Sequence, residues 1–166
     1  PTYIYGPGNY NPIEAWFFNR IIHNRPIPLP NEGNWITQLG HVKDLADAMS
    51  CSLEKDCATN RIYNCSGRQG VTFKGIVEIA SAACGKSKED VRVISFDPSG
   101  IDPKGRKSFP LRIGHFITDI SRIEKDLDWT PKYDLLEGFK DSYKNDYVLS
   151  EIIPLDFSSD DVLIGC

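Results

Sequence analysis

Long apolar segments are missing from this sequence of 166 residues. A membrane-spanning helix needs roughly 20 consecutive apolar residues, and every apolar run here is far shorter. We therefore expect no membrane partner. Internal repeats and low-complexity tracts are also missing. With 40% hydrophobic and 25% charged residues, the composition is that of a globular domain with an ordinary core.

Metal-ligand spacings are absent as well. The five cysteines are Cys51, Cys57, Cys65, Cys84 and Cys166, and no pair of them has the CxxC spacing. We therefore expect no metal site. Reduced core or surface thiols explain these residues best, and the alternative is a redox pair formed by the first two cysteines.

An excess of positive charge is missing too. The formal net charge is −4 at pH 7, which argues against a surface built mainly for nucleic acid. One basic cluster is nevertheless present, at Lys104, Arg106, Lys107 and Arg112. Such a cluster is typical of a solvated face. The alternative is an anion site for a nucleotide pyrophosphate or an RNA backbone.

The most informative stretch that is present opens the chain. Residues 2–5 are β-branched and aromatic, which predicts a buried strand. The strand ends at Gly6-Pro7-Gly8-Asn9, a run of turn-forming residues, and a helical pattern follows within a few positions. A strand, a glycine turn and a helix are typical of an open α/β sheet, where ligands bind beyond the carboxyl ends of strands. The alternative is a turn without a ligand.

The remaining pattern alternates helices and strands. Residues 13–24 predict a helix whose aromatic side chains belong to the core. Prolines confine residues 25–30 to an edge strand, while 31–33 predict a hairpin turn and 35–39 the returning strand. Further helices are expected at 41–53, 72–84, 121–127 and 135–147, and further strands at 61–65 and 91–96.

The helix at 41–53 has a clear apolar repeat. Its predicted buried face consists of Val42, Leu45, Ala46, Met49 and Leu53. His41 and Asp44 lie in its first turn, where we expect them to form local bonds and cap the helix.

Several motifs resemble a known family. The stretch Pro1-x-x-x-Tyr5-Gly6-Pro7-Gly8-Asn9 is similar to the loop after the sixth strand of the extended short-chain dehydrogenase/reductases, the NAD-dependent epimerase/dehydratase superfamily. The motifs GHVKDLA at 40–46, RIYNCSG at 61–67 and LDWTPK at 127–132 resemble the same superfamily. Longer stretches, among them 3–18 and 36–45, resemble the chloroplast stem-loop-binding proteins and their cyanobacterial relatives.

This resemblance implies an α/β fold: the C-terminal part of a Rossmann-like extended fold, with the last strands of the parallel sheet and a small α/β substrate lobe. Residues 1–150 would form that lobe and 151–166 a C-terminal tail. Because the chain starts inside a strand, we expect it to be a fragment whose partner is a missing N-terminal half. A homo- or hetero-oligomer is a further expectation.

The resemblance also implies a cofactor contact. In this superfamily the loop after the sixth strand lies beside the nicotinamide, so Pro1, Tyr3, Tyr5, Gly6 and Pro7 are the expected contacts to NAD or NADP in a full-length protein. Hydride transfer there also requires a glycine-rich pyrophosphate loop and a Tyr-x-x-x-Lys pair, and this chain contains neither. Alone, it is expected to bind no cofactor and not to act as a dehydrogenase.

Two positions depart from the pattern of nucleotide-sugar enzymes. Such relatives often carry asparagine where Tyr3 stands and arginine where Thr37 stands. Threonine cannot form the bidentate contact that a guanidinium makes with phosphate. Arg106 or Arg112 would have to supply that charge.

Two functions follow from the resemblance. The first is an RNA-binding protein of the stem-loop-binding type, which stabilises or cleaves RNA in a chloroplast stroma or a cyanobacterial cytoplasm. The second is the substrate lobe of an active NAD-dependent nucleotide-sugar epimerase, dehydratase or reductase. The candidate phosphate contacts are Lys104, Arg106, Lys107 and Arg112, and His115 is a candidate catalytic residue with a core or solvent role as the alternative.

Overall fold

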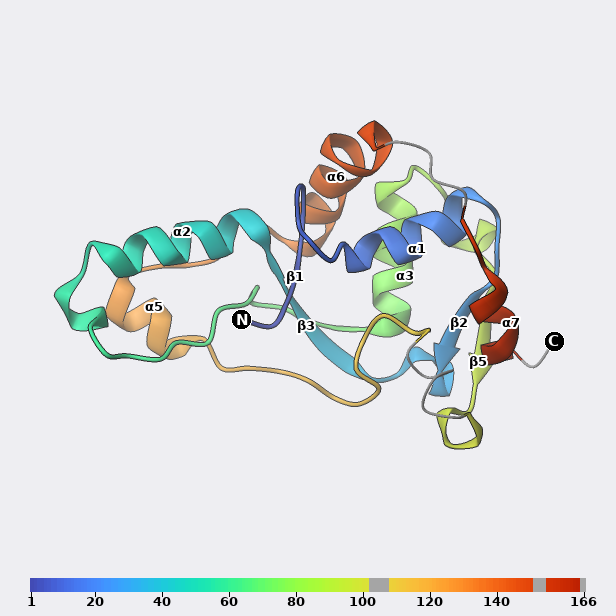
Figure 1. Ribbon diagram of the computed structural model, residues 1–166, viewed down its shortest axis with the longest axis horizontal. Coiled ribbons are helices and arrows are strands. Elements are labelled where there is room, and N and C mark those ends of the chain that lie inside the picture. The colour runs from blue at the N-terminus through green and yellow to red at the C-terminus, as the bar shows by residue number, and fades with distance from the viewer. Residues whose placement is uncertain (102–107, 151–154, 165–166) are drawn as a thin grey trace.

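A computed structural model describes residues 1–101, 108–150 and 155–164 of the chain. Its strands are β1 (Tyr3–Tyr5), β2 (Ile27–Pro30), β3 (Ile36–His41), β4 (Gly70–Thr72) and β5 (Val93–Phe96). Its helices are α1 (Ile13–Ile22), α2 (Val42–Leu53), α3 (Phe73–Ala83), α5 (Ser121–Leu127), α6 (Leu135–Asn145) and α7 (Ser158–Ile164). Figure 1 shows α2 and α5 at one end of the long axis and β2, β5 and α7 at the other, with β1 and β3 between them.

A three-stranded sheet lies at the centre, in the order β1-β3-β4. β1 runs parallel to β3, with Tyr3 opposite Leu39 and Tyr5 opposite His41. β4 pairs with β3 in the antiparallel direction. The predicted opening strand is therefore confirmed. Because β1 and β3 are parallel, their carboxyl ends meet at the same edge of the sheet.

The predicted hairpin after residue 30 is wrong. β2 is an edge strand as expected, but it pairs in parallel with β5 in a separate two-stranded sheet. Pro28 and Pro30 have no N–H groups, so β2 cannot form ladders on both sides, and β5 takes the one side that is available. The turn at Asn31–Gly33 instead leads the chain across to the central sheet, where β3 lies beside β1.

The helix ends follow the signals in the sequence. Thr72 caps α3 by accepting the N–H of Gly75, and Gly85 follows the helix with a φ of +70°, as expected for a left-handed C-terminal residue. His41 caps α2 by accepting the N–H of Lys43. These caps confirm the predicted starts of both helices.

A large core joins α1, α3 and α6 to both sheets. Aromatic rings dominate it: Phe18 meets Phe139 edge-to-face with centroids 5.9 Å apart, and Phe139 lies 5.0 Å from Tyr5. The prediction that the aromatic residues of α1 belong to the core is confirmed. The buried residues of this large core are Tyr5, Ile13, Phe17, Phe18, Ile21, Ile27, Leu29, Leu39, Phe73, Ile76, Val77, Ala80, Phe96, Phe109, Leu111, Leu135, Phe139 and Leu163.

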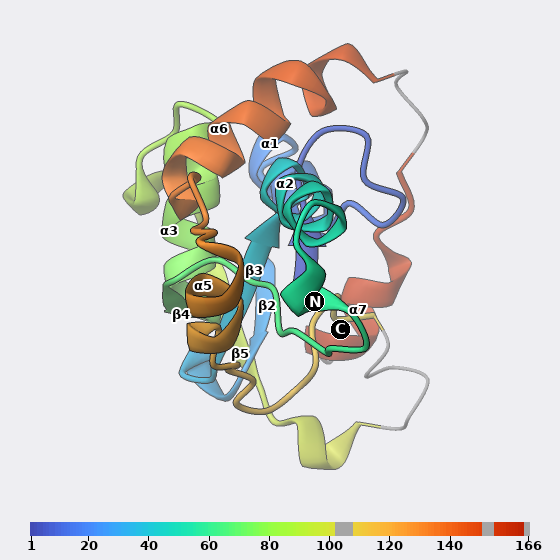
Figure 2. The same ribbon diagram turned by 90° about the vertical axis from the view of Figure 1, so that its left-hand side faces the viewer.

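A second, small cluster of buried side chains includes residues of α2 and α5, the two helices at the end of the molecule that faces the viewer in Figure 2. Its buried residues are Ala48, Cys65, Ile120, Ile123, Leu127 and Trp129. The predicted buried face of α2 is largely wrong, because Ala46, Met49 and Leu53 are exposed. Helix α2 buries Ala48 and the Asp44 carboxylate instead, since this carboxylate accepts the N–H groups of residues 132 and 133.

The strand predicted at residues 61–65 is also wrong. The segment is irregular, and most of it is exposed. One backbone bond, from the N–H of Thr2 to the carbonyl of Cys65, ties its end to the start of β1. Cys65 itself is buried by packing in the small cluster, not by a strand ladder.

The C-terminal helix α7 packs against β2 and β5 and places Leu163 in the large core. It is tied to α1 by a buried ion pair between Arg20 and Asp160, with an N–O distance of 2.5 Å. The guanidinium also lies 3.6 Å from the ring centre of Trp16. A buried charge is tolerated only when it is paired, so this contact fixes α7 on the domain.

In the ranges given above, no helix is both long and apolar enough to cross a membrane. The same residues contain no group of three His, Cys, Asp or Glu side chains arranged to hold a metal ion.

Candidate functional site

The glycine loop, residues 6–9, follows the carboxyl end of β1. Gly6 has a φ of +117°, and a Cβ atom there would lie 2.8 Å from the imidazole of His41 and 2.9 Å from Val42. Both the backbone conformation and the space therefore require glycine at this position. Gly8 also has a positive φ of +73°, but its surroundings are open.

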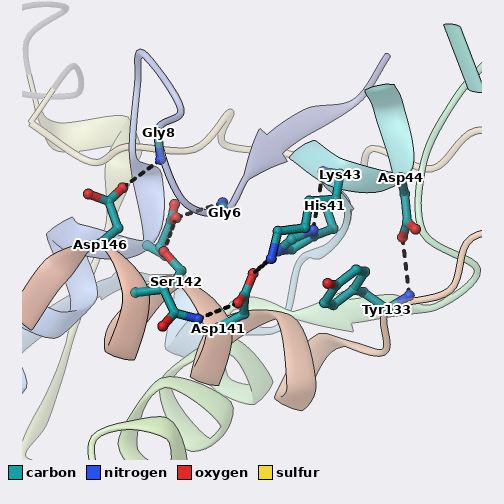
Figure 3. A network of polar contacts seen from close by, with 11 residues as sticks. Gly6, Gly8, His41, Lys43, Asp44, Tyr133, Asp141, Ser142 and Asp146 are labelled. Atoms are coloured by element: carbon teal, nitrogen blue, oxygen red, sulfur yellow. Dashed lines mark hydrogen bonds and ion pairs between the residues drawn. The ribbon is translucent and has the colours of Figure 1, made fainter. Parts of the chain in front are cut away.

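The amides of the glycine loop are bound by carboxylates of the same chain (Figure 3). The N–H of Gly6 donates to Oε1 of Glu14 at 2.8 Å, and the N–H of Gly8 donates to Oδ2 of Asp146 at 2.9 Å. The side-chain amide of Asn9 donates to the carbonyl of Ile4 in β1 at 2.6 Å. Backbone amides in such a loop would otherwise be suited to an anion. Here they hold the loop against α1 and the end of α6.

Glu14 joins three elements at this end of β1. Its side chain is buried, and its Oε1 also accepts the hydroxyl of Ser142 on α6 at 2.5 Å. Burial raises the pKa of this carboxyl, although the bonds from Ser142 and Gly6 favour the ionised form. Its second oxygen, Oε2, has no hydrogen-bond partner among the residues that the structure describes.

His41 is the last residue of β3, at its carboxyl end. Its ring stacks on Tyr133 with centroids 3.9 Å apart, and its Nε2 lies 3.3 Å from Oδ2 of Asp141 (Figure 3). Because Nδ1 accepts the N–H of Lys43, the ring proton belongs on Nε2, facing Asp141. Burial lowers the pKa of this imidazole. These contacts support the predicted local bonding role of His41.

A cavity of about 180 Å³ lies beside this network. Sequence reasoning did not single out the two cationic residues that line it, Arg68 and Lys132. Both are paired, Arg68 with Glu124 at 2.8 Å and Lys132 with Asp47 at 3.1 Å. The cavity is lined by Tyr5, Leu39, His41, Gly67, Arg68, Gln69, Pro131, Lys132, Tyr133, Asp134 and Leu135. With its cations neutralised, it offers little to a charged ligand.

The amino end of the β1–β3 pair has a different character. The Tyr3 hydroxyl accepts the backbone N–H of Arg112 at 2.7 Å, and its ring meets Phe116 edge-to-face at 5.8 Å. Both rings are half-buried. The side chain of Arg112 is exposed, so its charge faces solvent beside these rings.

His115 is held at the same end of the sheet. Its Nδ1 accepts the backbone N–H of Ile36, the first residue of β3, at 3.1 Å. The proton of the neutral ring therefore belongs on Nε2, and the side chain is exposed. Nearby, the backbone of Phe116 forms a bridge with Thr37. The Thr37 hydroxyl is buried and has no partner among the described residues. We call Tyr3, Thr37, Arg112, His115 and Phe116 the amino-end site.

The structure brings some of the predicted site residues together. Tyr3, Arg112 and His115 meet in the amino-end site, although 109 residues separate the first two. Lys104, Arg106 and Lys107 lie outside the described residues. Phe116 and Thr37 complete the site. Thr37 lies on β3 and Phe116 in a strand-like segment, and in each of them the alternation of residues shows which side chains share a face. No signal in the sequence shows that these two segments pair with each other.

The residues expected beside a nicotinamide differ in access. Pro1 is exposed and the ring of Tyr3 is half-buried, whereas the Tyr5 side chain is buried in the large core. Gly6 is buried and Pro7 is half-buried. Pro1 and Tyr3 fit the apolar face of a nicotinamide ring. The glycine loop does not fit the diphosphate of NAD, because two of its amides are bound to carboxylates that would repel it.

Comparisons with known proteins agree with the resemblance seen in the sequence. Residues 1–66 match the model of the NAD dependent epimerase/dehydratase family. The Arabidopsis thaliana protein named chloroplast stem-loop binding protein of 41 kDa b is 41% identical over 166 residues, which cover 99% of this chain and 43% of that protein. The chain thus spans less than half the length of this relative.

Solved structures show the same fold. The UDP-glucuronic acid 4-epimerase of Bacillus cereus superposes with a TM-score of 0.71 at 16% identity, over 90% of this chain and 44% of that one. The dTDP-glucose 4,6-dehydratase of Bacillus anthracis, solved with NAD, gives a TM-score of 0.62 at 20% identity, over 85% and 41%. The expected α/β architecture, the C-terminal part of a Rossmann-like extended fold, is thereby confirmed. Residues 1–66 thus match the NAD dependent epimerase/dehydratase family, the whole chain is similar to the chloroplast stem-loop binding protein, and its fold is that of epimerases and dehydratases.

Proposed function

We propose that this chain is the substrate-side part of an epimerase/dehydratase-family protein that binds stem-loop RNA in a chloroplast, to stabilise or process it. The support is the 41% identity over nearly the whole chain to a relative whose name describes a chloroplast protein that binds stem-loops. By contrast, the enzymes of similar fold share 16% and 20% identity with it. Identity at those levels supports a shared fold but does not support a shared substrate.

The amino-end site supports this proposal. Arg112 and the Nε2–H of His115 are exposed donors three residues apart, on a segment that runs beside the start of β3, and such donors suit a phosphate. Thr37 stands where many nucleotide-sugar relatives carry arginine, and its side chain is buried in contact with the sheet. A nucleotide sugar would therefore lack the bidentate partner for its diphosphate at this position.

A second function remains a candidate because the fold and Arg112 are shared with nucleotide-sugar enzymes. In that case a longer protein would carry NAD or NADP, with its nicotinamide beside Pro1 and Tyr3. The cofactor supplies hydride chemistry when bound. The residues of this chain would then orient the substrate, through the Arg112 guanidinium and the rings of Tyr3 and Phe116.

Anisotropy titrations of the 166-residue chain with a labelled stem-loop RNA, at several salt concentrations, test the first function. We expect binding that weakens with salt, and Arg112→Ala should lower the slope of log affinity against log salt by about one. Arg92→Ala, at an exposed arginine on another part of the surface, is the matched control and should leave the slope unchanged.

Two results would contradict the RNA function. One is the absence of any RNA binding at low salt. The other is a UDP-sugar that binds the chain far more tightly than RNA and depends on Arg112, which would favour the second function.

A further inference from the structure

The amino-end site has the composition of a pocket for one unpaired nucleotide. It combines two half-exposed aromatic rings that contact each other with an exposed arginine and an exposed histidine, which lie four residues and one residue before Phe116 in the chain. We propose that this site takes a single unstacked nucleotide from the loop of a stem-loop RNA, with the base against Tyr3 and Phe116 and its phosphate on Arg112 and His115. This inference rests on the proposed RNA function and names the part of the RNA that is recognised.

The two rings favour a base that is free of its helix. Tyr3 and Phe116 meet edge-to-face with an interplanar angle of 73°, so together they form a corner instead of a flat wall. Paired bases in an RNA helix hide their faces from protein, whereas loop bases can be splayed out and stacked on aromatic side chains. A half-exposed ring in a corner suits one such base.

The Tyr3 ring and the His115 donor are held in place before any ligand arrives. The Tyr3 hydroxyl is used by the backbone N–H of Arg112, which fixes both the ring and the start of the segment that carries the guanidinium. The bond between Ile36 and Nδ1 of His115 fixes the imidazole, so Nε2–H is the ring donor left for a ligand. Fixed groups lose little conformational entropy when they bind.

Thr37 lies on the same face of the sheet as Tyr3. In the parallel pair Tyr3 lies opposite Leu39, and side chains two positions apart along a strand share a face, so Thr37 and Tyr3 are on one side of the sheet. The Thr37 hydroxyl is buried without a partner among the described residues. Because Thr37 is only 1% exposed, the chain itself covers this hydroxyl, and a bound nucleotide would contact the rings and not Thr37.

The charge of the molecule also favours a local contact over one that follows a stem. A duplex is bound through many phosphates along an extended basic surface. This chain carries a net charge of −4, and three of its described cations, Lys43, Arg68 and Lys132, are already paired with carboxylates. One nucleotide with one phosphate needs no more positive charge than the amino-end site provides.

The test uses a stem-loop RNA with 2-aminopurine at successive loop positions, the same RNA with an abasic residue at each position, and the blunt stem duplex. The protein is the 166-residue chain. We expect quenching of 2-aminopurine fluorescence at one loop position, and a loss of affinity when that position is abasic. The duplex should bind about 10-fold more weakly than the stem-loop, or worse, because it offers no unstacked base to the two rings.

Phe116→Leu should abolish the quenching and weaken stem-loop binding about 10-fold or more, while its binding to the duplex stays unchanged. His115→Ala, which alters no ring of the corner, should weaken binding but keep the quenching. Tyr10→Leu is the matched control, because Tyr10 is fully exposed and lies beyond the opposite end of β1. Circular dichroism melts confirm that each variant is folded.

The outcomes separate this inference from the function on which it rests. If stem-loop and duplex bind equally and Phe116→Leu changes neither affinity, the RNA function stands and the nucleotide pocket is overturned. If none of the RNAs binds, the proposed function itself fails. Quenching that Tyr10→Leu removes and Phe116→Leu leaves intact would place the base at the wrong end of β1 and also overturn the proposal.

Discussion

The two ends of β1 differ in how their polar groups are used. At the carboxyl end, the amides of Gly6 and Gly8 are bound by Glu14 and Asp146, and the neighbouring imidazole faces a carboxylate. At the amino end, the guanidinium of Arg112 and one nitrogen of a histidine ring are exposed to solvent. Yet the glycine motif that attracts attention in the sequence belongs to the carboxyl end.

This difference shows that a motif typical of ligand binding can serve packing in a particular chain. The glycine loop has the sequence of a ligand-binding turn, but its backbone donors are taken by carboxylates from α1 and the end of α6. We expect substitutions at the carboxyl end to change stability and substitutions at the amino end to change binding.

The largest effect is expected at Gly6. Gly6→Ala must adopt a φ of +117° and place a methyl group 2.8 Å from His41, so both strain and overpacking oppose it. We expect a loss of about 3 kcal/mol in the free energy of unfolding, measured with urea. Gly8→Ala is the matched control in the same loop. It has open space at a φ of +73° and should cost only about 1 kcal/mol. Equal losses for both variants would show that packing around Gly6 is looser than described.

An intermediate effect is expected at Glu14, and it depends on pH. Burial raises the pKa of this carboxyl in the folded state, so the folded protein holds the proton more tightly than the unfolded chain. Its contribution to stability is complete below pH 4.5 and is lost as the pH rises through the folded pKa. Glu14→Gln keeps an oxygen for Gly6 and Ser142 but does not ionise.

The two proteins should therefore have nearly parallel stabilities below pH 4.5, while at pH 7 the variant should be relatively more stable, by on the order of 1 kcal/mol. Urea titrations across this range measure the difference, and the opposing effect of His41 is common to both proteins. A variant that loses stability relative to the parent as pH rises would contradict the assignment of a raised pKa to Glu14.

The smallest effect on stability is expected at the amino end. Arg112→Ala and His115→Ala alter exposed side chains and should change the free energy of unfolding by less than about 0.5 kcal/mol. The loss of the His115 ring leaves the Ile36 N–H to water, which limits its cost. Thermal melts of both variants beside the parent provide the measurement. A loss as large as that of Gly6→Ala would mean that both ends of β1 are structural.

Local signals in the sequence predicted most of the helices and strands. Thr72 and Gly85 mark the two ends of α3, and the proline-rich edge strand and the alternating residues of β5 are where they were expected. The pairing of β2 was not predictable from its turn, because its partner lies more than 60 residues away in the chain. Pattern alone therefore located the strands but not their neighbours.

The errors on α2 have a related cause. An apolar repeat shows which residues share a helix face but not which face is covered. The Asp44 carboxylate is drawn inward by two N–H groups 88 and 89 residues away, and Met49 and Leu53 on another side are left exposed. In the candidate site, Arg112 and His115 were recognised from the resemblance and the local charge. Their contacts with Tyr3 and Ile36 are long-range, so their geometry required the structure.

The buried pair between Arg20 and Asp160 has a consequence for synthesis of the protein. The two residues are 140 positions apart, and a ribosome adds roughly 5–20 residues per second, so α1 leaves the ribosome on the order of 10 s before its partner does. Throughout that delay the Arg20 guanidinium must keep its hydration shell, and helix α1 cannot pack against α7. The packing of α1 against α7 is therefore completed only after residue 160 has left the ribosome.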